Sequence, residues 1–247
     1  MSLRKRLGQH ILLDKIYVEL IASSAAATMP SSILEIGTGT GILTEFLCRK
    51  CDRVVSYEKD RKLLEAARLR LKKHKNVILV LGDGFQTKED CDTFVSNLPY
   101  SQSRKFILWA SEKKFKSAVV TVQHEFAEKI FAKAGEGNYR AVSVIGRASF
   151  HVSIIGTIPR NAFDPAPRVD SSILLFSRKR ILSTESIRSI IKLFSYKGKT
   201  VASALKHLNL NLNFPNQILL SRIGRLDVDD MYEIAERIAE FNSTRSK

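Results

Sequence analysis

Short apolar runs alternate with amphipathic stretches over residues 33–122, and this alternation limits the possible folds more than any other feature. Strands are predicted at Ile33–Ile36, Arg53–Glu58, Val77–Leu81, Thr93–Asn97 and Ser117–Val122. Helices are predicted between them at Ile42–Arg49, Arg61–His74 and Ser103–Glu112. Strands joined by helices of this length form right-handed βαβ units. We therefore predict an α/β fold with a mostly parallel sheet covered on both faces, completed by an antiparallel pair at Phe150–Ile158 and Ser172–Ser177.

The strand signals stop after Arg178. Short helices are predicted at Glu185–Phe194, Val201–Leu208, Pro215–Leu220 and Val228–Phe241, in addition to Ile16–Ala27 and Glu125–Ala134 earlier in the chain. Residues 178–225 contain ten Lys or Arg residues and one acid, Glu185. We predict a first domain over residues 1–178 and a small basic helical domain over residues 179–247. A solvated helical cap is the alternative interpretation of this charge run.

The whole chain is basic, with 40 Lys and Arg residues against 25 Asp and Glu residues and a formal net charge of +15. Such an excess favours a polyanionic partner such as nucleic acid. No apolar run is long enough to span a membrane and the start has no signal-peptide core, so we expect a cytoplasmic protein. Three cysteines cannot all pair, and Cys48-x-x-Cys51 has no second pair to complete a zinc site, so no metal is expected.

A glycine turn, Gly37-Thr38-Gly39-Thr40-Gly41, follows the first predicted strand and its acidic residue Glu35. Glycines at a first βα turn let a ligand approach the backbone and the helix N-terminus. A dinucleotide fingerprint would need a further glycine where Ile42 stands. Glu58, Asp83 and Asn97 end the next three strands, and ligands of open α/β sheets bind at that edge. A carboxylate at Glu58 can hold both ribose hydroxyls, and Asp83 can accept from an adenine amine. Such adenosine contacts without a pyrophosphate cradle indicate S-adenosylmethionine rather than NAD.

The segment Asn97-Leu98-Pro99-Tyr100 ends the fourth strand. Pro99 interrupts the ladder and favours an extended Leu98. The Asn97 side-chain oxygen and the Leu98 carbonyl would then lie beside the ring of Tyr100, an arrangement that suits the amine of a planar base. The alternative is a strand followed by a proline turn, with Tyr100 packed in the core.

Taken together, these segments resemble the rRNA adenine N6,N6-dimethyltransferase family. The resemblance covers nearly the whole chain and rests on segments in the family's order and spacing: Leu7–Leu12, the glycine turn, Gly82-Asp83, Asn97–Tyr100, Gln123–Ala127, Phe163–Ser172 and Phe194–Thr200. His10, where bacterial members usually carry Asn, resembles the archaeal and eukaryotic branch.

The resemblance implies a Rossmann-like class I S-adenosylmethionine-dependent methyltransferase with S-adenosylmethionine as its cofactor. It implies cofactor contacts at His10, Leu12, Gly37, Glu58, Asp83 and Asn97. It also implies catalytic roles for Asn97, Leu98, Tyr100 and Phe163, with the two aromatic rings enclosing the target adenine. The family methylates two adjacent adenosines near the 3′ end of small-subunit rRNA and takes part in subunit assembly, so rRNA in a pre-ribosomal particle is the expected partner, and a monomer is expected.

The sequence departs from the family pattern in three places: the first removes rigidity from the glycine turn and should be tolerated, and the other two bear on RNA contacts. Thr38 replaces the usual proline of the glycine turn, Gln102 and Arg104-Lys105 replace Ile and Ser-Pro, and Gly198 interrupts the usual basic run. RNA contacts are predicted at Arg4, Lys5, Arg104, Lys105, Lys197 and Lys199. Surface solubility is the alternative role for these charges.

Three rival functions stay open at this point. The chain could be a non-catalytic rRNA-binding assembly factor, or an adenine methyltransferase acting on large-subunit rRNA or DNA. A protein glutamine methyltransferase has a similar Asn-Pro-Pro-Tyr motif, although Leu98 and the basic composition argue against it.

Overall fold

The computed structural model describes residues 10–245, and the chain divides into two compact units. The first contains the described residues up to Phe106, together with 114–127 and 151–178. The second contains residues 107–113, 128–150 and those from Lys179 onward. One division therefore lies at 178/179, where the sequence analysis places its boundary. The second unit also includes two earlier segments that the sequence analysis assigned to the first domain.

The first unit is built on strands and short helices in alternation. Its elements are β1 (Ile11–Leu12), α2 (Lys15–Ala26), β2 (Ser32–Ile36), α3 (Ile42–Cys48), β3 (Arg53–Glu58), α4 (Arg61–Arg70), β4 (Val77–Leu81), β5 (Thr93–Asn97), β6 (Ser117–Gln123), β7 (Phe150–Ile158), β8 (Phe163–Asp164) and β9 (Ser171–Arg178). Helices α5 (Ser103–Glu112) and α6 (His124–Phe131) begin in this unit and end in the other.

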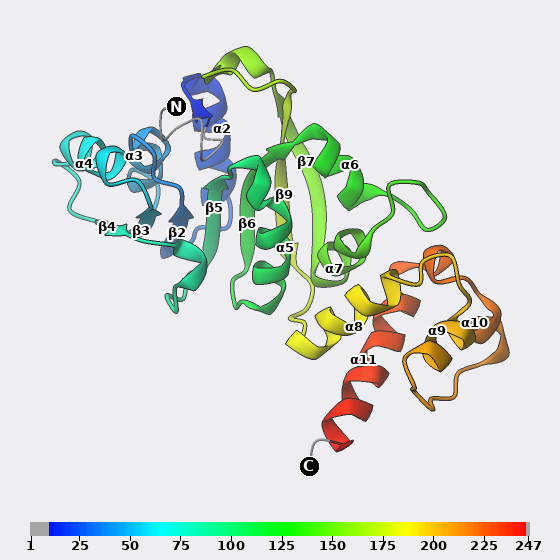
Figure 1. Ribbon diagram of the computed structural model, residues 1–247. Coiled ribbons are helices and arrows are strands. Elements are labelled where there is room, and N and C mark those ends of the chain that lie inside the picture. Colours follow the sequence, from blue (N-terminus) through cyan, green and yellow to red (C-terminus); the bar gives the residue numbers. More distant parts are fainter. Residues whose placement is uncertain (1–9, 246–247) are drawn as a thin grey trace. The chain divides into compact units, whose positions relative to one another are not determined.

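The large sheet has seven strands in the order β4-β3-β2-β5-β6-β9-β7 (Figure 1). Neighbours among the first five strands are parallel, and β9 runs antiparallel to β6. The predicted α/β fold is confirmed. Strands β3 and β4 lie on one side of β2, whereas β5 and β6, which come later in the chain, lie on its other side. This change in strand order places a crevice at the carboxyl ends of β2 and β5.

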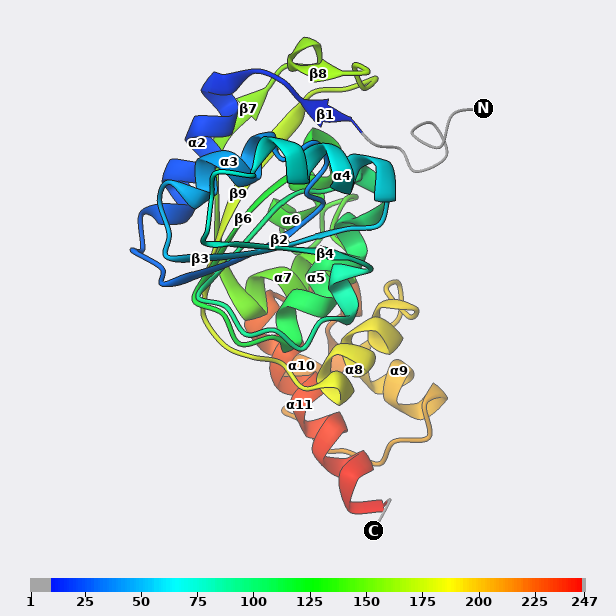
Figure 2. The ribbon, with the colours of Figure 1, turned by 90° about the vertical axis from the view of Figure 1, so that its left-hand side faces the viewer.

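The two faces of the sheet have different cores. Helices α2, α3 and α4 lie on one face (Figure 2), where Ile21 and Leu47 join Val95 in one buried cluster. Because side chains alternate along a strand, Phe94 points to the opposite face. There it stacks on Phe106 at a centroid distance of 5.2 Å, in a group of aromatic rings that also includes Phe115 and Phe176.

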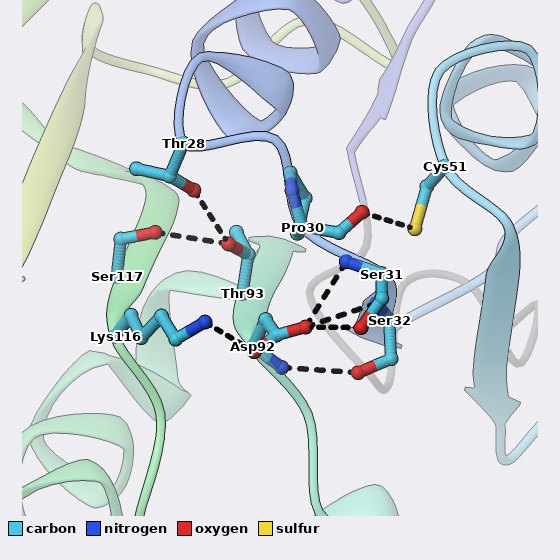
Figure 3. Close-up of polar contacts among 9 residues, drawn as sticks. All are labelled: Thr28, Pro30, Ser31, Ser32, Cys51, Asp92, Thr93, Lys116 and Ser117. Atoms are coloured by element: carbon cyan, nitrogen blue, oxygen red, sulfur yellow. Dashed lines mark hydrogen bonds and ion pairs between the residues drawn. The ribbon is translucent and has the colours of Figure 1, made fainter.

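The amino ends of β2, β5 and β6 are joined by a polar cluster around Asp92 (Figure 3). One carboxylate oxygen of Asp92 accepts hydrogen bonds from the Ser31 N–H at 3.0 Å, the Ser31 hydroxyl at 2.6 Å and the Ser32 N–H at 3.3 Å. The other oxygen pairs with the Lys116 ammonium at 2.9 Å. The Ser31 hydroxyl and Lys116 hold the pKa of Asp92 well below its usual range. This cluster ties three strands together at the edge opposite the crevice.

The second unit is helical. After residues 107–112 of α5 and the end of α6 it contains α7 (Ala141–Ser149), α8 (Thr184–Phe194), α9 (Val201–His207), α10 (Asn216–Leu220) and α11 (Val228–Arg245). The Ser183 side chain caps α8 and the Thr200 side chain caps α9. Tyr139 is buried and donates its hydroxyl to the Leu226 carbonyl at 2.9 Å.

Several elements differ from the prediction. Helix α4 ends at Arg70 rather than His74, and Asn76 then donates to the carbonyls of Cys48 and Cys51 at 2.8 Å each, which starts β4. Helix α6 ends at Phe131 rather than Ala134.

Helix α7 was not predicted. Its residues Val142, Val144 and Ile145 favour a strand by local preference, but all three are buried in the helical unit, and tertiary packing overrides that preference.

Within the described residues, no helix combines the length and the apolar character needed to cross a membrane.

Candidate functional site

A cleft of about 730 Å³ lies at the carboxyl ends of β2, β3 and β5. Eight of the predicted site residues line it together: His10, Leu12, Gly37, Glu58, Asn97, Leu98, Tyr100 and Phe163. They come from positions spread over more than 150 residues of sequence. Asp83, the ninth, lines an adjoining cavity of about 560 Å³ that shares Gly37, Glu58, Leu98 and Pro99 with the cleft.

The glycine turn forms the floor of the cleft. Gly37, Gly39 and Gly41 have φ values of +93°, +57° and +81°, which side chains other than glycine adopt only with strain. A Cβ added at Gly39 would meet no atom within 4 Å, so the turn leaves open space above its backbone. At Gly41 a Cβ would lie 3.2 Å from the Ala67 side chain, so glycine also allows α3 to pack on α4.

Glu58 is held rigidly at the end of β3. Its Oε2 accepts from the Gly39 N–H at 2.8 Å, and its Oε1 accepts from the N–H groups of Lys59 and Asp60 at 2.8 and 2.9 Å. The residue is 3% exposed. A carboxylate accepts about four hydrogen bonds, so three are already used. The sequence analysis expected this carboxylate to hold both ribose hydroxyls, but in this arrangement it has room for about one more donor.

Asp83 carries two ion pairs. Its Oδ2 lies 3.1 Å from the ammonium groups of both Lys59 and Lys105, and its Oδ1 accepts from the Phe85 N–H at 3.1 Å. Burial raises the pKa of this carboxyl, but the hydrogen bonds from Lys105 and Lys59 outweigh it, so its pKa lies below the usual range. The Lys105 ammonium also lies 4.7 Å from the ring centroid of Phe85. Lys105, predicted to contact RNA, is exposed and pairs with Asp83 in this structure.

Asn97 is oriented by the segment that covers the cleft. Its side-chain nitrogen donates to the His10 carbonyl at 3.1 Å, so the amide oxygen is the end of the side chain left for a ligand. Ser96 next to it donates to the Ile36 carbonyl at 2.5 Å and joins β5 to the glycine turn. Asn97 itself lines the cleft, together with His10.

Tyr100 has both its ring and its hydroxyl fixed. The hydroxyl lies 2.8 Å from the Ser171 hydroxyl, and the ring centroid lies 5.4 Å from that of His10, at 30°. Burial raises the pKa of the phenol, so it is neutral at physiological pH. The alternative of a core tyrosine is not what the structure shows, since Tyr100 is only half-buried and lines the cleft.

Phe163 and the His10–Leu12 segment form the remaining wall. Strand β1 pairs with β8, which sets Leu12 opposite Phe163, and the His10 imidazole lies 2.7 Å from the Pro165 carbonyl. Phe163 is 5% exposed and belongs to the core cluster with Leu12. Little of its surface is therefore open to the cleft that it lines.

The remaining predicted RNA contacts fall into three groups. Arg4 and Lys5 lie outside the described residues. Arg104 and Lys199 are exposed. The Lys197 ammonium lies 2.9, 3.3 and 3.4 Å from the carbonyls of Tyr139, Glu136 and Gly137, so it has little capacity left for a phosphate.

The Cys48-x-x-Cys51 pair is buried and free. Burial raises the pKa of the Cys48 thiol to about 12 and also raises that of Cys51, so neither is a reactive thiolate. No cluster of three potential metal ligands occurs among residues 10–245.

Sequence reasoning missed Ser56, Thr44 and Ser171. Each is a small hydroxyl residue buried beside a site residue, at a position where an apolar side chain would be expected. That local exception to the apolar pattern is the only signal that could have indicated them.

Comparisons with known proteins agree on one family. The family model described as "Ribosomal RNA adenine dimethylase" matches residues 1–240. The chain is 34% identical over 96% of its length to "Ribosomal RNA small subunit methyltransferase A" of Thermotoga petrophila, covering 92% of that protein. It is 31% identical over 82% of its length to "Probable ribosomal RNA small subunit methyltransferase A" of Methanopyrus kandleri, covering 76% of it. A crystal structure of a dimethyladenosine transferase from Plasmodium falciparum superposes with a TM-score of 0.79, at 26% identity, covering 95% of this chain and 98% of that one.

Proposed function

Because the chain belongs to the ribosomal RNA adenine dimethylase family, we propose that it methylates the N6 amines of two adjacent adenosines near the 3′ end of small-subunit rRNA. The product is N6,N6-dimethyladenosine. The observation that carries the proposal is the orientation of Asn97, whose nitrogen is bound to the His10 carbonyl while its oxygen is left to the cleft beside Tyr100.

The residues of the cleft fit S-adenosylmethionine. The open backbone at Gly37 and Gly39 leaves space for the methionine part, Glu58 accepts from a ribose hydroxyl, and Asp83 accepts from the adenine amine. Leu12 in β1 and His10, the residue that precedes β1, also line this cleft. When bound, the cofactor supplies a methyl group activated by its sulfonium.

Asn97 and Leu98 direct the target amine. The lone pair of an adenine amine is delocalised into the ring, so the free amine is a weak nucleophile. Hydrogen bonds from its two N–H groups to the Asn97 side-chain oxygen and the Leu98 carbonyl would orient the lone pair toward the methyl group. Positioning of this kind supplies much of the rate, and no strong general base is needed. The amine becomes acidic as the methyl group arrives and loses one proton to solvent in each transfer. One N–H therefore remains after the first transfer, and one acceptor is sufficient for the second.

Tyr100 supports the extruded base. An adenosine must leave its stack to enter the cleft, and stacking on an aromatic ring offsets part of that cost. The hydrogen bond to Ser171 fixes the Tyr100 ring for this purpose. Phe163, which is 5% exposed, would contact the base with the small part of its surface that is open to the cleft. Unpaired RNA is accordingly the expected form of the target.

We further propose that the partner is rRNA in a pre-ribosomal particle and that the enzyme works as a monomer in the cytoplasm. The exposed Arg104 and Lys199 are the described candidates for phosphate contacts. The basic residues 179–247 supply a second RNA-binding region, supported by the excess of Lys and Arg over acids in this stretch.

The test is incubation of the protein with labelled S-adenosylmethionine and immature small subunits, followed by nucleoside analysis. N6,N6-dimethyladenosine at two adjacent positions is expected. Cofactor binding without transfer to small-subunit rRNA would instead support a different nucleic acid target, and absence of cofactor binding would support the non-catalytic assembly factor.

A further inference from the structure

A chain of buried hydroxyl groups connects the glycine turn to Glu35. The Thr38 hydroxyl oxygen lies 2.6 Å from that of Ser56, and the Ser56 hydroxyl donates to Glu35 Oε2 at 2.6 Å. From the other side, Thr44 donates to the same oxygen at 2.6 Å. Glu35, Thr44 and Ser56 have no exposed surface, and Thr38 is 4% exposed.

The direction of these hydrogen bonds follows from the number of protons. A hydroxyl has one proton, and the Ser56 hydroxyl donates its proton to Glu35 Oε2. Because the Ser56 proton points to Glu35, Thr38 must be the donor to Ser56. The series therefore has one orientation: Thr38 to Ser56 to Glu35.

Thr38 is also fixed through its backbone. The N–H groups of Gly37 and Thr38 donate to the Tyr57 carbonyl at 2.8 and 3.2 Å, and the Gly41 N–H donates to the Thr38 carbonyl at 2.9 Å. The side chain thus adds a second attachment to β3, on Ser56, beside the backbone attachment on Tyr57. Gly37 and Gly39, on either side of Thr38, line the cleft.

We propose that Thr38 is a positioning residue for the cofactor: its hydroxyl, acting through Ser56 and Glu35, holds the glycine turn in the shape that accepts S-adenosylmethionine. The inference deepens the proposed function and rests on it for the identity of the ligand. It assigns a role to the residue that replaces the family's usual proline, with hydrogen bonds in place of a ring constraint.

Glu35 shows why the hydroxyl donors matter. Its other oxygen, Oε1, is buried and has no hydrogen-bond partner within residues 10–245. Burial raises the pKa of this carboxyl to about 7, against the opposing effect of the bonds from Ser56 and Thr44. Because the Glu35 carboxyl is buried with few hydrogen-bond partners, its conformation depends on the donors Ser56 and Thr44. The Thr38 hydroxyl orients the Ser56 hydroxyl.

The test compares Thr38→Val, which has nearly the same shape without the hydroxyl, with Thr38→Ser, which keeps it. The matched control is Thr121→Val on β6, because the Thr121 hydroxyl is buried with no hydrogen-bond partner in the described part of the chain. Affinity for S-adenosylhomocysteine is measured by calorimetry. We expect T38V to bind about fivefold more weakly, as the loss of one buried hydrogen bond implies, and T38S and T121V to bind within twofold of the wild type.

Kinetics separate positioning from a general structural defect. For T38V the KM for S-adenosylmethionine should rise in parallel with the dissociation constant, while kcat at saturating cofactor and the KM for RNA stay unchanged. Ser56→Ala should weaken binding at least as much, and T38V/S56A should be no weaker than S56A alone, because both changes interrupt the same series.

Binding of T38V within twofold of the wild type would overturn the inference. So would a T38S variant as weak as T38V, or an additive double variant. Should T38V fold poorly, the cofactor affinities of T38S and S56A still test the inference: T38S should bind like the wild type and S56A more weakly, and equal affinities of the two variants would contradict it. If the wild type binds S-adenosylhomocysteine with this mutational pattern but methylates no rRNA, the proposed function fails and the role of Thr38 stands.

Discussion

Glu58→Gln tests how the cofactor site is held together. The carboxylate accepts three backbone N–H groups, two on Oε1 and that of Gly39 on Oε2. A glutamine oxygen can keep the bonds from Lys59 and Asp60. Its nitrogen then faces the Gly39 N–H, which sets one donor against another.

The cost follows from this geometry. One charge-assisted hydrogen bond is lost, and the Gly39 N–H is left without its acceptor, a change worth about 2 kcal/mol. If that energy is drawn from the conformation of the turn that binds cofactor, affinity falls about 30-fold, since about 1.4 kcal/mol corresponds to a factor of ten. The free energy of unfolding should fall by a similar amount.

The assay is calorimetric binding of S-adenosylhomocysteine together with urea unfolding. Glu65→Gln is the matched control, because the Glu65 side chain is 58% exposed on α4 and pairs with Arg68, three residues along the same helix. It should change binding by less than about twofold and stability by less than about 0.5 kcal/mol. If E58Q binds cofactor within threefold of the wild type at unchanged stability, the N–H groups around Glu58 do not hold the site, and this reasoning is refuted.

Further variants probe other parts of the molecule. Asn97→Ala should abolish methylation of rRNA while the affinity for S-adenosylhomocysteine falls by no more than about fivefold; equal loss of both, measured on one preparation, would contradict its role at the target amine. Asp92→Ala, at the opposite edge of the sheet, should lower the free energy of unfolding by about 2 kcal/mol with unchanged cofactor affinity. Because the pKa of Asp92 is lowered in the folded protein, this difference in stability between wild type and variant should disappear when the pH falls below the usual pKa range of a carboxyl group. Burial raises the pKa of Glu35 to about 7, so the free energy of unfolding should fall as the pH rises from 4.5 to 7. Glu35→Gln should remove up to about 3 kcal/mol of this decrease, measured by urea unfolding at pH 5 and pH 8. Lys197→Met should lower stability without reducing RNA affinity in a filter-binding assay, whereas Lys199→Met should reduce RNA affinity and its salt dependence without lowering stability; the reverse pattern would restore Lys197 as the RNA contact.

Much of the fold follows from the sequence by itself. Strands β3, β4 and β5 and helix α5 occur at their predicted bounds, because each strand is a short run containing β-branched or aromatic residues and α5 has a clear apolar face. The location of the site also follows, since the glycine turn, Glu58 and Asn97 each end a strand, and parallel strands end at one edge.

Helix α7 shows where local pattern is insufficient. Val142, Val144 and Ile145 favour extended structure, and the sequence offers no strong start signal before them. Their burial in the helical unit decides the conformation, as does the close approach of Gly146 to Ile130, where a Cβ would lie 3.4 Å from the side chain. Such contacts join residues that are separated in sequence, so they do not produce a hydrophobic periodicity from which the helix could be predicted.

What only the tertiary structure decided is how the polar groups are paired. Lys105 and Lys197 are predicted as RNA contacts, and the structure adds that Lys105 ion-pairs with Asp83 while Lys197 donates to the carbonyls of Glu136, Gly137 and Tyr139. The Asn97 amide is oriented by a carbonyl 87 residues away. Hydrophobic periodicity is a local property and can be read along the chain, whereas a hydrogen bond depends on which donor and acceptor the finished fold brings within about 3 Å.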